Sequence, residues 1–162
     1  MLFFTADNHF CHKNIIKYCN RPFNSIKEMN GVMIERWNSK VASDDTVIVA
    51  GDFCLCNRER FKEIHDSLNG RKIYLKGSHG DKTTKAFLKL VELEYIGYQF
   101  SVTHNPDDIN CTHRLNLSAH VHDKWEVKTI NDSIVVNIGV DVWNFYPITI
   151  EEVAKRYKNW VL

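Results

Sequence analysis

Charge of one sign, long hydrophobic runs and linker segments are all missing from this sequence. Its 21 basic and 20 acidic residues leave a formal charge of only +1, whereas a domain that binds duplex nucleic acid usually has a clear basic excess. No apolar run approaches the roughly 18 residues that a membrane-spanning helix needs. We therefore expect neither a duplex nucleic-acid partner nor a membrane segment, and the sequence leaves the oligomeric state open.

Disulfides and targeting signals are not expected either. The five cysteines are odd in number, and the apolar start over residues 1–6 is only as long as a strand, without a basic leader or a small-residue cleavage site. These features predict a reducing, cytoplasmic location. Without an internal repeat or a Pro/Gly/Ser-rich linker, residues 1–162 are expected to form a single domain, and 44% apolar residues can supply its core.

Strands and helices alternate in the first half of the chain. Short apolar runs bounded by turn residues indicate buried strands, and Ser25 and Asn57 are good N-cap residues ahead of helical spacing. The predicted strands cover 2–6, 46–50 and 72–76, and the predicted helices cover 26–37, 57–68 and about 83–90.

The second half of the chain reads mostly as strands. They are predicted over about 94–103, 114–119, 125–129 and 133–138. A capping box at Thr149 then starts a terminal helix with Val153, Tyr157 and Trp160 facing inward. This order predicts an α/β (α+β) fold in which two packed sheets form a β-sandwich flanked by helices.

Polar clusters follow the predicted strands at the points where they end. In α/β sheets, ligands bind outside the carboxyl ends of the strands, and side chains fixed on rigid elements suit a metal site. The clusters are Asp7-Asn8-His9, Gly51-Asp52, Ser78-His79, His104 and His120-Val121-His122.

The residue types in these clusters indicate transition metals. Carboxylates and imidazoles suit Mn, which we favour, and also Fe, Ni or Zn, whereas an all-oxygen Ca or Mg cage would not use several histidines. In Asp7-x-His9 and His120-x-His122, alternate residues of an extended segment point the same way, so both members of a pair can reach one centre. Two divalent ions roughly 3.5–4 Å apart can clamp a phosphoryl group and generate hydroxide near neutral pH.

In this order, the clusters resemble the motifs of the calcineurin-like metallophosphoesterases. The family pattern is Asp-x-His, Gly-Asp, Gly-Asn-His-Asp/Glu, a lone His and Gly-His-x-His. It stands here as Asp7-Asn-His9, Gly51-Asp52, Gly77-Ser-His79, Thr103-His104 and Ala119-His120-Val-His122. Five motifs in order are a specific signal, although each alone is weak. The stretches 9–16 and 136–143 are also similar to a small single-domain branch, and the resemblance implies the same two-sheet sandwich.

The resemblance also implies a role for each matching residue. Asp7, His9 and His122 would hold the first ion, His104, His120 and Ser78 the second, and Asp52 would bridge the two. His79 would lie over the phosphate and protonate the leaving group.

One loop departs from the family pattern. Ser78 stands where the family has an Asn whose carbonyl ligates the second ion, and a hydroxyl is a shorter and weaker ligand. The family's acidic residue directly after the His is replaced by Gly80, with Asp81 one position later. We therefore expect weaker binding of the second ion.

Two further candidates follow the first ligand pair. His12 and Asn14 are placed to contact phosphate from a helix start, and a solvated first turn explains them equally well. Both are kept as candidate substrate-binding residues.

These observations predict a dinuclear phosphoesterase in which metal-bound hydroxide attacks phosphorus. A compact, open site suits a small phosphorylated substrate, and we favour a nucleotide-like phosphodiester over a monoester. The alternative is a catalytically degenerate member of the fold that serves as a binding scaffold, which the Ser78 loop favours. A DNA-repair type of nuclease would need a basic face or an added domain, and neither is visible.

Overall fold

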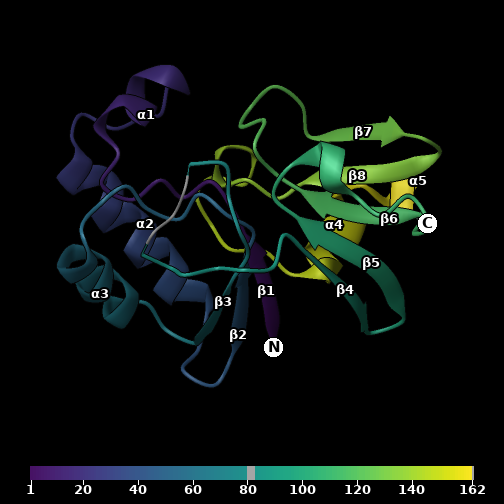
Figure 1. Ribbon diagram of the computed structural model, residues 1–162, viewed down its shortest axis with the longest axis horizontal. Coiled ribbons are helices and arrows are strands. Elements are labelled where there is room, and N and C mark those ends of the chain that lie inside the picture. Colours follow the sequence, from purple (N-terminus) through teal and green to yellow (C-terminus); the bar gives the residue numbers. More distant parts are fainter. Residues whose placement is uncertain (80–82, 162) are drawn as a thin grey trace.

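In the computed structural model, which describes residues 1–79 and 83–161, the strands form two sheets (Figure 1). The smaller sheet is parallel, with the order β1-β2-β3. The larger sheet has the order β4-β5-β6-β8-β7, with β5, β6 and β8 parallel and with antiparallel strands at both edges. The strands are β1 Leu2–Thr5, β2 Thr46–Val49, β3 Arg71–Tyr74, β4 Leu90–Tyr95, β5 Tyr98–Thr103, β6 Leu115–Ser118, β7 Val127–Ile130 and β8 Ser133–Asn137. The predicted fold class is confirmed.

Strands β1 and β2 of the small sheet are buried on both faces, which is why they read as continuous apolar runs. The edge strand β3 is partly exposed. Successive side chains of a strand point to opposite faces. Phe4 and Ile48 therefore join the core between the two sheets. Phe3 and Val47 belong to a second core, on the other face of the small sheet.

Helices α2 (Ile26–Lys40) and α3 (Arg58–Ser67) contribute to that second core and cover this face of the small sheet (Figure 1). Both predicted N-caps are confirmed, since Ser25 and Asn57 accept hydrogen bonds from backbone N–H groups three residues on. Ser25 and Glu28 have the residue types of a capping box, but only half of it forms, because the Glu28 carboxylate accepts from the backbone N–H of Asn24 instead of that of Ser25.

The helix predicted near 83–90 is wrong. No helix is present in its described part, and the chain reaches β4 at Leu90. The Leu88 carbonyl accepts from the backbone N–H of Lys76, and the Lys89 carbonyl accepts from Thr103 Oγ1. Phe87 is 90% exposed, so the apolar residues whose spacing suggested a helix do not pack against a core.

The single strand predicted over 94–103 is also wrong, because it is a hairpin. Strands β4 and β5 pair in antiparallel register and turn at Ile96 and Gly97. Both turn residues have positive φ, 46° and 84°, as a two-residue type I′ turn requires. A β-branched residue is rare in that conformation, so the sequence around Ile96 did not indicate a turn.

The terminal helix begins as predicted. Thr149 and Glu152 form a complete capping box ahead of α4 (Ile150–Arg156), and Val153 and Tyr157 are buried. The helix breaks at Tyr157, and a short α5 follows at Lys158–Val161. The inward position predicted for the Trp160 side chain lies outside the described part. Among the described residues, no helix is long and apolar enough to cross a membrane.

Candidate metal centre

The loops that follow β1 and β2 run side by side and form the floor of the site. The backbone N–H groups of Asp7, His9 and Phe10 donate to the carbonyls of residues 51, 52 and 53, at 3.3, 2.9 and 2.9 Å. The Asp7 carboxylate then accepts from the backbone N–H of His120 at 2.8 Å. Segments far apart in the sequence are thereby held together by backbone hydrogen bonds.

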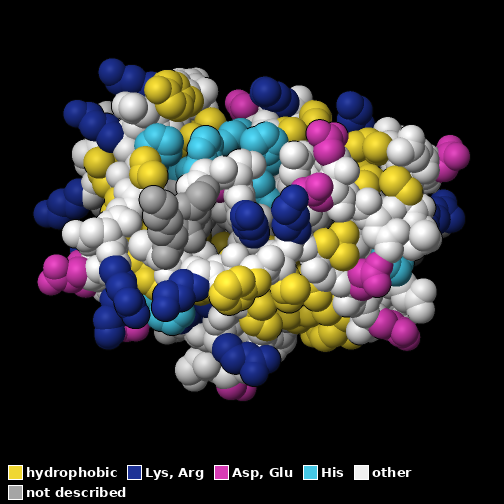
Figure 2. Space-filling model, viewed as in Figure 1, with side chains coloured by type: hydrophobic (Ala, Val, Ile, Leu, Met, Phe, Trp, Pro, Cys, Tyr) yellow, Lys and Arg dark blue, Asp and Glu magenta, His cyan; other side chains and the backbone are white. Residues whose placement is uncertain are grey.

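Six sequence-predicted residues converge there as two triads. In each triad, the candidate ligand atoms all lie within 4.8 Å of one another. Histidine side chains gather in one cluster on the face shown in Figure 2. The first triad is Asp7, His9 and His122, and the second is Asp52, His104 and His120.

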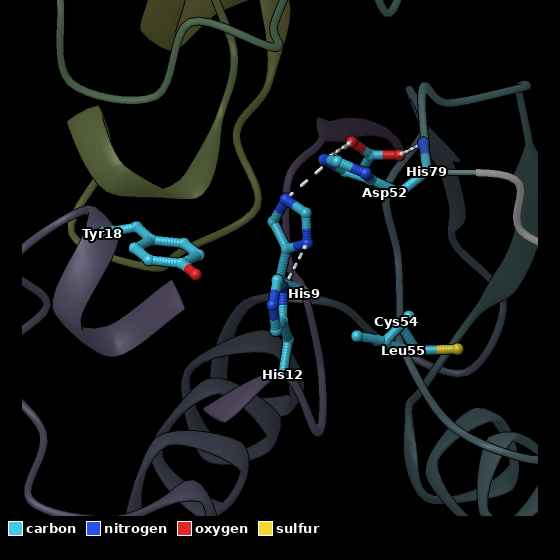
Figure 3. A pocket seen from close by; sticks show the side chains of 7 residues that line it. All are labelled: His9, His12, Tyr18, Asp52, Cys54, Leu55 and His79. Atoms are coloured by element: carbon cyan, nitrogen blue, oxygen red, sulfur yellow. Dashed lines mark hydrogen bonds and ion pairs between the residues drawn. The ribbon is translucent and has the colours of Figure 1, made fainter. Parts of the chain in front are cut away.

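Asp52 lies between the triads. Its Oδ2 is 3.9 Å from His9 Nε2, in the first triad, and 3.3 Å from His104 Nε2, in the second. His79 Nε2 is 4.0 Å from the same oxygen, and the backbone N–H of His79 donates to Oδ1 at 3.0 Å (Figure 3). One carboxylate therefore faces both groups.

Three buried atoms of these triads, Asp7 Oδ1, His9 Nε2 and His104 Nε2, have no hydrogen-bond partner. An unsatisfied buried polar group costs about 1–3 kcal/mol, so three in one place call for a ligand. His104 Nδ1 lies 2.9 Å from the Ala50 carbonyl oxygen and must donate to it, which leaves the lone pair on Nε2. These donors fit divalent transition-metal ions.

Glycine is required beside two of the loops. Gly51 has φ +86°, and a Cβ there would lie 2.7 Å from both Gly77 Cα and His104 Nδ1. A Cβ on Gly77 would overlap Asp52 Oδ1 and its backbone nitrogen. The two glycines let the strand ends approach each other closely enough to assemble the site.

Strained backbone is concentrated at the same place. Five of the six triad residues have left-handed φ values between 48° and 69°. Such a conformation costs about 1–2 kcal/mol for a residue with a Cβ, although Asp and His tolerate it better than most. These residues are Asp7, His9, Asp52, His120 and His122.

Burial and charge shift the pKa values within the site in opposite directions. Burial lowers the pKa of His9 to about 3, against the attraction of Asp52. Burial also raises the pKa of Asp7. For Asp52, burial is outweighed by His104 and by the backbone N–H of His79, so its pKa is lowered. Burial opposes charge on His104 as well, but Asp52 and Asp7 raise its pKa.

Sequence reasoning missed a buried ion pair behind the first triad. Arg21 donates to both carboxylate oxygens of Asp141, at 2.8 and 3.0 Å, and to the backbone carbonyls of Asp7 and Asn8, at 2.7 and 2.9 Å. Asp141 accepts from His122 Nδ1 at 2.9 Å, which turns His122 Nε2 toward the site. Asp141 follows the end of β8, so the strand-end rule would have found it, whereas nothing local indicates Arg21.

That network raises the pKa of His122 to about 10, because the hydrogen bonds to Asp141 and Cys19 outweigh the effect of burial. Cys19, His122 and Asp141 also lie close enough to hold an ion. Arg21 already occupies both Asp141 oxygens, so this third group is a poor competitor for metal.

The remaining predicted residues lie around the triads. Ser78 Oγ is 3.3 Å from His120 Nδ1, beside the second triad. The His79 side chain is 65% exposed. His12 lines a pocket of about 300 Å³ together with His9, Asp52 and His79, whereas Asn14 is exposed on α1 (Lys13–Tyr18) and does not line it. The expected departures at Gly80 and Asp81 lie outside the described residues.

Comparison with known proteins places the chain among relatives. No family model matches the sequence. Among solved structures, a protein of unknown function from Aquifex aeolicus, AQ665, has a TM-score of 0.74 at 21% identity, over 96% of this chain and 98% of that one. A double mutant of Vps29 from Entamoeba histolytica has a TM-score of 0.50 at 16% identity, over 84% and 72%.

The uncharacterized protein MJ1445 from Methanocaldococcus jannaschii is 34% identical to this chain, over 95% of this chain and 89% of that protein. The chain belongs to the family of MJ1445. Its fold is the small calcineurin-like metallophosphoesterase fold, as the sequence motifs predicted. In this fold, the two Asp/His triads are the candidate metal sites, and they lie at the carboxyl ends of the strands.

Proposed function

We propose that this protein is a dinuclear metal-dependent phosphoesterase, and that a nucleotide-like phosphodiester is its preferred substrate. The observation that carries the proposal is the convergence of three buried donor atoms without hydrogen-bond partners, on Asp7, His9 and His104. A fold without a ligand there would retain their full desolvation cost.

Each triad would hold one divalent ion, with Asp52 facing both. When bound, two such ions activate water and neutralise the charge of a phosphoryl group. Mn²⁺ is our first choice, and Fe, Ni and Zn suit the same donors. The Arg21–Asp141 pair would fix the ring of His122, since a carboxylate behind a ligating histidine sets its tautomer and orientation.

His79 would hold a proton for the leaving oxygen. Its ring is exposed toward solvent, and its backbone N–H is tied to Asp52, so the imidazole is free to approach a bound ester. General acid catalysis of this kind contributes roughly 10²–10⁴-fold.

The test is a metal analysis of the purified protein, followed by hydrolysis of p-nitrophenyl mono- and diesters with Mn²⁺, Ni²⁺, Zn²⁺ or Mg²⁺. We expect two metal equivalents at saturation and faster diester hydrolysis. Asp52→Asn should abolish activity and leave the fold intact, and Asp44→Asn, at an exposed turn, is the matched control. A wild-type protein that binds no metal and cleaves neither ester would favour the scaffold alternative.

A further inference from the structure

Two exposed apolar side chains line the pocket beside the candidate metal centre. Tyr18 is 74% exposed and Leu55 is 54% exposed, yet both line the pocket that contains His9, Asp52 and His79. Single exposed apolar residues are common. Two in one pocket, next to a site for phosphate, call for an apolar part of the ligand.

The two side chains come from different elements and are held by ordered backbone. Tyr18 is the last residue of α1, and its ring packs edge-on against the His12 ring, with 6.3 Å between the two ring centroids. The backbone N–H of Leu55 donates to the Phe10 carbonyl at 2.9 Å. Figure 3 shows Tyr18 on one side and Leu55 on the other, with His9 and His12 between them.

The pocket beside the second triad is charged rather than apolar. A second pocket, of about 230 Å³, lies beside His104 and Ser78 and is lined by Lys76 and Lys89, with Asp108 as the counter-charge. Lys and Arg side chains are visible next to the histidine cluster in Figure 2. An apolar ring would gain little there, so the aromatic pocket and the charged pocket distinguish the two sides of a bound ester.

From these observations we propose that Tyr18 and Leu55 bind a planar aromatic group of the substrate, of nucleobase type, beside the reacting phosphate. The volume of about 300 Å³ is at the low end for ligand pockets, roughly 300–1,000 Å³, so it suits one ring system. A base stacked on Tyr18 would be sequence-tolerant, because every base has a π-face. This inference rests on the proposed function and specifies its substrate class.

The experiment compares the binding of adenosine 5′-monophosphate and ribose 5-phosphate to the metal-loaded protein by calorimetry. The two probes share a phosphate monoester and differ by the base. We expect the nucleotide to bind roughly 5- to 150-fold more tightly, the range of one base–aromatic stacking contact. Tyr18→Ala should remove most of this ratio without changing the affinity for ribose 5-phosphate, and Tyr18→Phe should keep it.

Controls separate this inference from the proposed function. Phe87→Ala, at a 90% exposed aromatic that does not line the pocket, should leave the ratio unchanged, and Leu55→Ser should lower it. Equal affinities for both probes, in a wild type that still hydrolyses p-nitrophenyl diesters, would overturn the aromatic subsite alone. A wild type that binds neither probe and cleaves no ester would overturn both proposals.

Discussion

Replacing Arg21 with methionine removes a buried charge from behind the candidate metal centre. The Arg21 side chain is fully buried and its partner Asp141 is 3% exposed. Breaking such a pair strands the remaining charge and costs about 3–5 kcal/mol. The carbonyls of Asp7 and Asn8 also lose their donors, so we expect the upper part of that range. A domain has only about 5–15 kcal/mol of stability to lose.

Urea unfolding followed by tryptophan fluorescence measures the loss. With a slope of about 2 kcal/mol per molar urea, a loss in the upper part of that range should lower the midpoint by about 2–2.5 M. The double variant Arg21→Met/Asp141→Asn should lose less stability than the sum of the losses of the two single variants, because it leaves no unpaired buried charge behind. Arg60→Met is the control, since the Arg60–Glu63 pair is half-exposed and such pairs contribute about 0–1 kcal/mol. A loss below about 1 kcal/mol for Arg21→Met would refute this reasoning.

Gly77→Ala should displace Asp52, because the added Cβ would overlap that residue. We expect metal affinity, measured by calorimetric titration, to fall more than the free energy of unfolding does. Metal titrations identical to those of the wild type would contradict the overlap. Ser78→Asn should raise affinity for the second metal equivalent by about 10–100-fold, measured by calorimetry; identical curves would mean that residue 78 does not act on the metals. His79→Ala should slow esters with poor leaving groups roughly 10²–10⁴-fold but p-nitrophenyl esters much less, and equal losses would exclude a proton-donor role. Burial and nearby lysines lower the pKa of His65, so its stabilising contribution, present above an unfolded pKa of about 6.5, should be lost as pH falls through the lower folded value. Urea midpoints of wild type and His65→Gln should therefore converge toward acid, and parallel pH profiles would contradict this.

The sequence predicted what local patterns determine. Strands β1 and β2 were visible because both of their faces are apolar, and the triads were visible because their donors follow strand ends. The Arg21–Asp141 pair was not visible, since 120 positions separate its members and no spacing links them. The segment before β4 was misread because its apolar spacing suited a helix, although residues such as Phe87 lie in solvent.

The left-handed backbone of the site has a consequence for how this fold changes over generations. Asp or His in that conformation costs about 1–2 kcal/mol, and glycine adopts it freely at a cost of about 0.5–1 kcal/mol in chain entropy. Replacing such a residue by glycine therefore removes a metal donor and at the same time relieves the backbone strain at that position. In a lineage that no longer needs catalysis, selection for folding alone does not preserve the donors.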